Sequence, residues 1–388
     1  MLAYKQEWLD NKVLHEEAEE AYRQQCISKE EKERIFQAYP VPFYTPNIFI
    51  RIGLFLLTVV IVLFSFGLFG LMFIQLIKES WQGLIIFFGL ITYGALEFMI
   101  RETKHHRSGV DDALLWGSIS LLLSGITMAL PNDTPYLVYS LIIFMVTAYA
   151  ALRFADTLMS IAAVIALLAC LFYAAINMGT AGRIAAPLLL MIASYGIYAW
   201  ARKWDWKTKW RHYRHCGSII EITTLLTGYL SVNYLVVREA SNEFFDLNLA
   251  PGQSIPAAWL FWIFTVLIPL AYIAAGVWKK NVILLRTGLV LIAGIVLTVK
   301  QYHHMAPIEL EMTLGGLVMI GIAYVLIRYL KTPKHDFTSQ EIDNTHLLEK
   351  IQGESLVVSE SFTPTPTPAP GFNFGGGTGG GGGAQGGW

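Results

Sequence analysis

Three ionisable residues lie inside long apolar stretches of this sequence, where their side chains could bind protons or ions. They are Glu97, Glu221 and Arg286. Burying a charge in lipid costs several kcal/mol unless the group finds water or a partner, so such residues are candidate functional sites. A carboxylate at this position can bind a proton or a cation, and a guanidinium can act as its counter-charge or bind an anion. The alternative is a structural ion cluster, or side chains that extend toward the nearby membrane surface.

The spacing of neighbouring basic residues indicates that the three charges share one depth. Glu97 is about one helical turn from Arg101. Glu221 lies six residues after His215, which corresponds to roughly 9 Å of helix rise. Arg286 is similarly close to the basic end of its own stretch. We therefore expect one candidate intramembrane charge network on the cytoplasmic side of the membrane.

Polar side chains also recur along one face of two apolar stretches. The candidate polar lining consists of Ser120, Ser124 and Thr127 in one stretch and Thr224 and Ser231 in another. A spacing of three and four residues places side chains on one helix face. Such a face could line a solute path, but small and hydroxyl-bearing residues are also the ordinary material of helix packing in lipid. Packing is the favoured interpretation.

Ten apolar stretches must hold these residues, and each approaches the roughly 20 residues that a helix needs to cross a bilayer. They run from Phe49 to Leu76, Leu84 to Ile100, Ala113 to Leu130, Tyr136 to Leu152, Thr157 to Asn177, Ile184 to Ala201, Gly217 to Val237, Ala257 to Trp278, Val282 to Val299 and Ile308 to Leu330. The 54% hydrophobic and 15% charged composition is far from that of a soluble domain. The sequence predicts an all-α polytopic transmembrane bundle of about ten spans over residues 48–330.

Basic residues are divided unevenly between the two sets of loops. The rich set contains Arg101, Lys104, Arg107, Arg153, Arg202, Lys203, Lys207, Lys209, Arg211, Arg214, Lys279, Lys280, Arg328, Lys331 and Lys334. The other set contains Lys78, Arg183, Arg238 and Lys300. Because Lys and Arg near span ends stay on the cytoplasmic side, we expect both termini in the cytoplasm and an even number of spans.

The densest basic segment is RKWDWKTKWRHYRH, from Arg202 to His215, where aromatic residues alternate with cations. This composition is compatible with nucleic-acid binding. Beside a membrane span, however, it is more simply an interfacial anchor that contacts anionic lipid. We therefore expect anionic lipid at Arg202 to Arg214 and no nucleic-acid partner.

Residues 1–47 are polar and predict a small cytoplasmic helical segment. We expect three short helices, with a first break at Asp10-Asn11 and a second before Ser28. Ser28 and Glu31 have the spacing of a capping box, in which each side chain binds the backbone amide of the other residue.

This segment also carries a resemblance to known proteins. The pattern consists of Trp8-Leu9, Val13-Leu14 and Glu17, followed by many spans. It resembles an uncharacterised family of bacterial predicted polytopic membrane proteins with a short N-terminal helical segment. The resemblance implies a bacterial cytoplasmic (inner) membrane and transfers no functional residue.

Residues 331–388 predict a disordered cytoplasmic tail. Thr363 to Pro370 repeats proline at alternate positions, which favours a stiff extended spacer. The end, GFNFGGGTGGGGGAQGGW at 371–388, has too few apolar residues to fold alone. It resembles the glycine-rich C termini of bacterial membrane-anchored proteins of the TPM type. Phe372, Phe374 and Trp388 could contact a protein partner, or the tail could be inert, and both interpretations stay open.

Two functions follow from these features. The first is a small-solute transporter or permease, favoured by shared-depth charges and by an even set of spans that divides into two halves of five. The second is a non-enzymatic membrane scaffold or assembly factor that recruits partners through its N-terminal helices and its tail. We expect no enzymatic activity, because the sequence contains no phosphate loop, nucleophile elbow or zinc-protease motif, and we expect no metal or cofactor.

Overall fold

The computed structural model of this protein describes residues 2–204, 210–245 and 253–302, with isolated helical residues between 313 and 328. At residues 74–80, 180 and 183 it describes the backbone alone. The chain forms two compact units, Met1–Pro307 and Ile308–Trp388. The tail predicted over residues 331–388 lies outside the described residues.

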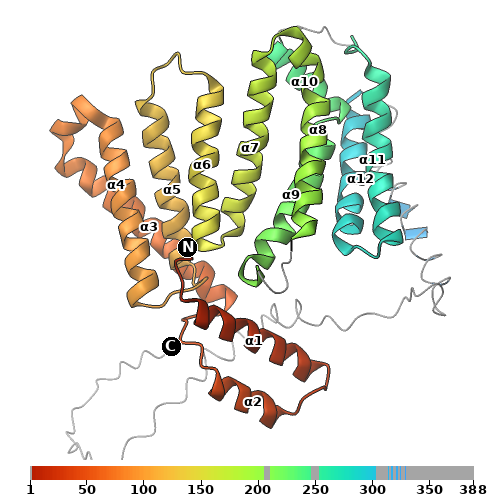
Figure 1. Ribbon diagram of the computed structural model, residues 1–388. Helices are drawn as coiled ribbons and strands as arrows, with labels where there is room; N and C mark the ends of the chain where they lie inside the picture. Colours follow the sequence, from red (N-terminus) through yellow and green to blue (C-terminus); the bar gives the residue numbers. More distant parts are fainter. Residues whose placement is uncertain are drawn as a thin grey trace, which may run out of the picture. The chain divides into compact units, whose positions relative to one another are not determined.

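The described part of the chain is helical throughout and contains no β-strand, which confirms the all-α prediction. In the first unit the helices are α1 (Gln6–Arg23), α2 (Lys29–Ala38), α3 (Ile48–Met72), α4 (Ile74–Glu102), α5 (Val110–Ala129), α6 (Tyr136–Phe154), α7 (Thr157–Asn177), α8 (Thr180–Lys203), η1 (Arg211–Tyr213), α9 (Arg214–Leu230), α10 (Tyr234–Phe245), α11 (Ala258–Trp278) and α12 (Val282–Tyr302). Figure 1 shows the bundle helices side by side in a row from α4 to α12, with α1 and α2 as a hairpin beneath the lower ends of these helices.

Eight described helices are long and apolar enough to cross a membrane, and the protein is an integral membrane protein. A ninth span results if α9 and α10 are counted together. They bend by 72° at a short break, so the segment predicted as a span from Gly217 to Val237 consists of two helices rather than one. The tenth predicted span, Ile308 to Leu330, lies for the most part outside the described residues.

Asn233 explains the bend between α9 and α10. Its Oδ1 accepts from the amides of Leu235 at 3.0 Å and Val236 at 3.3 Å, as an N-terminal cap does. Its Nδ2 donates to Thr298 Oγ1 and to Tyr229 OH, both at 2.9 Å. The buried Asn233 side chain therefore binds backbone amides at the start of α10 that have no helical partner at the break. No local sequence pattern predicts this bend.

The N-terminal segment forms two helices, not the three that were expected. Asp10 and Asn11 stay inside α1 because their side chains bind elsewhere: Asn11 Nδ2 donates to the carbonyl of Pro40 at 3.0 Å, and Asp10 pairs with Arg211. The capping box at α2 is confirmed, with Glu31 accepting from the Ser28 amide at 2.7 Å and Ser28 Oγ accepting from the Glu31 amide at 3.2 Å.

Two separate hydrophobic clusters form the core of the first unit. One joins the N-terminal segment to α4, α5, α6 and the start of α7, and includes Leu96, Leu115 and Phe154. The other joins α9 to α12 and includes Leu225, Tyr229 and Tyr272. The two halves of the bundle are thus packed around different centres, with α7 and α8 adjoining between them.

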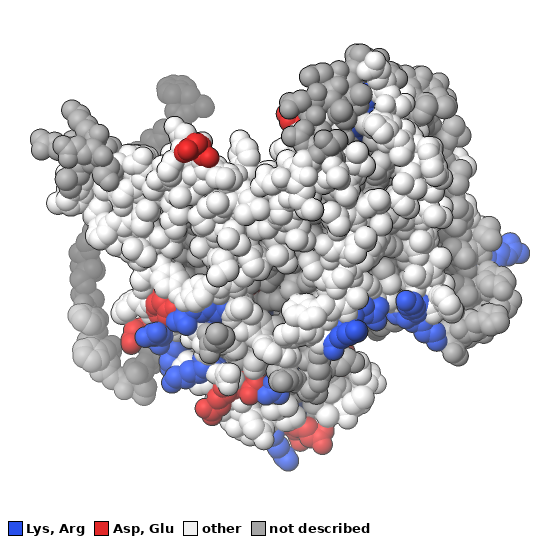
Figure 2. Space-filling model, turned by 45° about the horizontal axis from the view of Figure 1, so that its top comes forward, with Lys and Arg blue, Asp and Glu red and all other residues white. Residues whose placement is uncertain are grey.

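Charged side chains are concentrated at one end of the bundle. Figure 2 shows a broad belt without charged side chains on the visible face, with most Lys and Arg gathered along its lower margin. We call this the basic end, and it includes the start of α3 and the ends of α4, α6, α8 and α11. The apolar belt and the basic margin are the arrangement expected of helices that cross a bilayer.

The start of α5 depends on a glycine. Gly109 caps α5 with φ of +93°, a conformation that L side chains rarely adopt. A Cβ atom built on Gly109 would also overlap the carbonyl oxygen of Arg51 in the first turn of α3. This position therefore requires glycine for both backbone conformation and space.

Gly109→Ala should lower the stability of the purified protein by about 1–3 kcal/mol, because it adds a strained dihedral and a clash with backbone. The measurement is the temperature at which half of the detergent-solubilised protein stays monodisperse. The matched control is Gly94→Ala on α4, where a Cβ meets nothing within 4 Å. Equal midpoints for the two variants would contradict the prediction.

Candidate functional site

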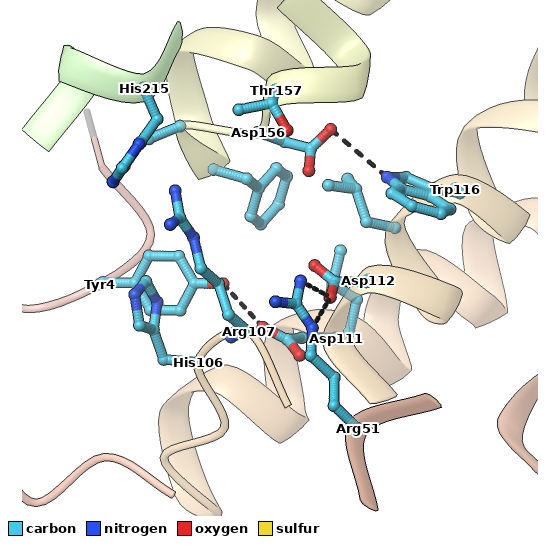
Figure 3. Close-up of a pocket in the computed structure, with 14 residues that line it drawn as sticks. Tyr4, Arg51, His106, Arg107, Asp111, Asp112, Trp116, Asp156, Thr157 and His215 are labelled. Atoms are coloured by element: carbon cyan, nitrogen blue, oxygen red, sulfur yellow. Dashed lines mark hydrogen bonds and ion pairs between the residues drawn. The ribbon is translucent and has the colours of Figure 1, made fainter. Parts of the chain in front are cut away.

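Two adjoining cavities lie between the N-terminal hairpin and the basic end of the bundle, with volumes of about 270 and 380 Å³. We treat them as one site, the hairpin cavity. The residues that line both parts are Tyr4, His106, Arg107, Phe154, Ala155 and His215. Figure 3 shows the polar side chains that converge on the first part. The site is therefore built from the N-terminal segment and several bundle helices together.

Asp111, in the first turn of α5, organises one wall of the cavity. Its carboxylate accepts from the Arg107 amide at 2.6 Å and from the Ser108 amide at 2.8 Å. It also accepts from Ser108 Oγ at 3.0 Å and from Tyr4 OH at 3.3 Å. Burial and the neighbouring Asp111 charge both raise the pKa of Tyr4, so its hydroxyl remains a donor. One carboxylate thus fixes the preceding loop and the N-terminal segment.

The adjacent Asp112 joins α5 to α3. Its Oδ2 accepts from Arg51 Nη2 at 2.5 Å and from Arg51 Nε at 3.1 Å. Figure 3 shows the guanidinium beside this carboxylate. The ion pair neutralises both groups, so neither contributes net charge to the cavity.

Asp156 fixes the opposite side of the cavity. Its Oδ1 accepts from the Met159 amide at 2.8 Å and caps the first turn of α7. The same oxygen accepts from Trp116 Nε1 of α5 at 3.3 Å. The Asp156 carboxylate therefore joins α5 to α7.

The hairpin is held over the cavity by polar and aromatic contacts. Asp10 Oδ1 pairs with Arg211 at 2.5 Å and with His212 Nε2 at 2.9 Å. The Ala3 amide donates to the Arg153 carbonyl at 2.9 Å. The ring of Tyr4 meets His106 edge-on, with centroids 4.7 Å apart. These contacts close the cavity on the side away from the bundle.

Two cations at the cavity have no salt-bridge partner, although Glu16 and Glu17 also line its second part and the Glu16 charge partly opposes the lowering of the Lys12 pKa. Lys12 of α1 and Arg107 of the α4–α5 loop form no ion pair within 4 Å in the described part of the chain. The Arg107 side chain extends toward His215 (Figure 3). Burial, followed by the positive charge of Arg107, lowers the pKa of Lys12. Two like charges therefore face one space, an arrangement that an anion would stabilise.

His106 adds an unsatisfied polar atom to the same space. Its side chain is 8% exposed, and its Nδ1 has no hydrogen-bond partner among the described residues. Burial, and then the charges of Lys12, Arg107 and Arg51, lowers its pKa to about 2. The imidazole is consequently neutral, and an orphaned buried nitrogen of this kind costs about 1–3 kcal/mol unless a ligand or water binds it.

Within the described part of the chain, no ion pair joins Glu97, Glu221 and Arg286 to one another. Glu97 Oε1 accepts from Arg153 at 2.6 Å, and its Oε2 pairs with Arg101 at 3.3 Å. Glu97 is thus part of a structural ion cluster at the ends of α4 and α6.

The other two predicted charges lie on different helices, far along the row. Glu221 is half-buried on α9, where it interacts electrostatically with Arg202 of α8. Arg286 is exposed on α12, and Figure 1 places α12 and α4 at opposite ends of the row. The depth estimate from sequence did not reveal that α4 lies far from α9 and α12, which pack against each other.

The predicted polar lining does not converge on a shared cavity among the described residues. Ser120 and Ser124 are exposed on the outer surface of α5, and Thr127 donates to its own helix at Leu123 at 2.8 Å. Thr224 is fully buried and donates to Ile220 at 2.8 Å, and Ser231 donates to Gly228 at 2.9 Å. The hydroxyl groups therefore satisfy carbonyls of their own helices, as packing residues do.

Sequence reasoning missed the residues that build the hairpin cavity. The signal that could have found them is HHRSGVDD, residues 105–112, a short connection between two spans with an unusual density of ionisable groups. Within the described chain no group of three or more His, Cys, Asp or Glu side chains is placed to hold a metal ion. Comparisons with protein-family models, curated proteins and solved structures find no match, so the two family resemblances stay predictions.

The buried His106 should make stability depend on pH. Because its folded pKa lies below the unfolded value of about 6.5, the unfolded chain binds the proton more readily, and stability present above pH 6.5 is lost as pH falls. His106→Gln should flatten this loss, which for one group approaches about 1.4 kcal/mol per pH unit. Thermal midpoints of both proteins from pH 7.5 to 5 measure the effect.

The control for this experiment is His15→Gln, which replaces a histidine of α1 that stacks on Phe36 and lies outside the cavity. It should keep the pH dependence that His106 causes. An unchanged slope in His106→Gln would remove His106 as its source.

Proposed function

We propose that this protein is a small-solute permease of a bacterial cytoplasmic membrane and that the hairpin cavity binds an anionic solute. The observation that carries the proposal is a pair of cations without a salt-bridge partner, Lys12 and Arg107, beside the orphaned Nδ1 of His106. A phosphate or carboxylate would accept from all three groups. Charge-assisted bonds of this kind are about twice as strong as neutral ones.

The orientation supports access to the cavity from the cytoplasm. Lys and Arg gather at the basic end, and the positive-inside rule assigns that end to the cytoplasm. The proposal keeps ten spans and both termini in the cytoplasm. Glu221, in the membrane-spanning part of α9, is the carboxylate proposed to couple solute movement to a proton or cation. Glu97 is less suited to that role because two arginines already neutralise it.

We also propose that the protein is not an enzyme. The three carboxylates best placed to transfer protons in the cavity are Asp111, Asp112 and Asp156. Asp111 accepts from the 107–108 backbone, Asp112 pairs with Arg51, and Asp156 caps the first turn of α7. General acid–base catalysis needs a group that is free to exchange its proton with a substrate. Glu16 and Glu17 line the outer part of the cavity and are exposed, and the two cations without a salt-bridge partner there suit binding rather than proton transfer.

Inorganic phosphate should stabilise the purified protein, because a ligand that binds only the folded state adds about 2.7 kcal/mol at one hundred times its dissociation constant. Arg107→Gln and Lys12→Gln should lose most of this stabilisation. Arg34→Gln, an exposed arginine of α2 outside the cavity, should keep it. Thermal midpoints against phosphate at constant ionic strength provide the measurement.

Uptake of labelled phosphate by proteoliposomes separates transport from binding. A permease gives saturable uptake that Arg107→Gln reduces and Arg34→Gln does not. Equal phosphate stabilisation of all three variants would contradict the anion site, and binding without uptake would contradict the permease.

One observation favours the alternative, a membrane scaffold or assembly factor. The hairpin is fixed to the bundle through Asp10 and Tyr4, yet α2 has no buried residue. A helix fixed on one face to α1, with most of its other residues exposed, suits recruitment of a protein partner. The aromatic residues of the C-terminal tail are proposed as a second point of contact.

If the protein is a scaffold, replacing acidic residues of α2 by basic ones should weaken the binding of its protein partners. Glu30→Lys with Glu33→Lys changes two exposed positions that do not line the hairpin cavity. Affinity capture from cross-linked cells, compared with wild type by quantitative mass spectrometry, should show at least one partner reduced several-fold. A partner set unchanged by this variant and by deletion of residues 371–388 would contradict the scaffold.

A further inference from the structure

We propose that a groove between α8 and α11 binds one anionic phospholipid, with its phosphate between Arg202 and Lys279 and one acyl chain along the groove. We call it the tyrosine groove, and its volume is about 530 Å³. It lies in the second hydrophobic half of the bundle. The inference therefore stands independently of the solute proposed for the hairpin cavity.

The two walls of the groove are single faces of two helices. On α8 the lining residues are Tyr195, Tyr198, Ala199 and Arg202, and on α11 they are Ala271, Tyr272, Ala275 and Lys279. Their spacing of three and four residues keeps each set on one face. The alanines leave space between the helices, and Leu225 of α9 lines the depth of the groove. Such a wall is mostly apolar along its length.

Polar groups within the groove are already satisfied. Tyr195 OH and Tyr272 OH share a hydrogen bond of 2.6 Å, and Tyr272 OH donates to the Leu225 carbonyl at 3.1 Å. The tyrosines therefore present their rings rather than free hydroxyls to an occupant. Hydrocarbon fits this surface, at roughly 0.8 kcal/mol for each CH₂ group buried.

The mouth of the groove has the opposite chemistry. Arg202 is exposed near the end of α8, where its Nη1 donates to Tyr198 OH at 3.2 Å. Lys279 is exposed at the C-terminal end of α11. The nearby Glu221 forms no ion pair with Arg202 within 4 Å in the described chain, so the mouth keeps net positive charge.

An anionic phospholipid is the occupant that matches both chemistries. A soluble anion would leave the apolar walls uncovered, and a zwitterionic lipid would bring a cation of its own to a mouth that already holds two. Basic pockets between membrane helices at the level of the head groups are the known setting for anionic lipid recognition. The groove opens at the basic end of the bundle, which is the margin where lipid head groups lie.

Native mass spectrometry of the delipidated full-length protein tests the proposal, with phosphatidylglycerol and phosphatidylcholine as probes. Wild type should retain phosphatidylglycerol preferentially. Arg202→Gln with Lys279→Gln should weaken its binding about 30-fold, from roughly 1 kcal/mol per basic residue. Lys203→Gln, which removes an exposed cation that does not line the groove, should leave binding within about threefold.

A second pair of variants tests the apolar wall without changing charge. Ala271→Trp should fill the groove and displace phosphatidylglycerol, whereas Ala274→Trp, also exposed on α11 but outside the groove, should not. Gel filtration confirms that each variant is folded. Equal loss with Lys203→Gln, unchanged binding in Ala271→Trp, or displacement of the lipid by equimolar glycerol 3-phosphate would each overturn the proposal.

Discussion

The carboxylate of Asp111 is the constraint on which the hairpin and its cavity depend. It accepts from the amides of Arg107 and Ser108 and from the hydroxyl of Tyr4, which lies more than one hundred residues earlier in the chain. The hydrogen bonds from Asp111 fix the backbone of the α4–α5 connection, and this backbone directs the side chain of Arg107 into the cavity. The same contacts place the N-terminal segment over the basic end, so that Lys12 faces Arg107. The proximity of Lys12 and Arg107 therefore results from the hydrogen bonds that Asp111 accepts.

Pairing of charges at the basic end explains how an apolar bundle tolerates ionisable residues. Arg51 with Asp112, and Arg153 with Glu97, each join two helices near the membrane surface. Breaking such a pair leaves a partly buried charge without a partner, which costs more than the pair itself contributes. Two separate hydrophobic clusters extend from this end. The hairpin cavity belongs to one half of the bundle and the tyrosine groove to the other.

The membrane environment also determines how hydroxyl groups are used. Thr224 is fully buried, yet it donates to a carbonyl of its own helix and offers nothing to a solute. Gly228 lies one turn later and allows α8 to approach, since a Cβ there would meet Ser194 at 3.3 Å. A stripe of small and hydroxyl residues therefore indicates close helix contact, as its composition predicts for packing in lipid.

The sequence alone determined the features that depend on neighbouring residues: the apolar length of eight described spans, the Ser28–Glu31 cap and the bias of basic residues toward one set of loops. The partners of Glu97 and of Asp112 lie 56 and 61 residues away, and only tertiary structure could identify them. Depth along a helix follows from residue number, whereas the direction of a side chain and the neighbour it meets depend on helix rotation and order. Glu97 and Arg286 could therefore be assigned to helices from the sequence, but those helices pack in different halves of the bundle.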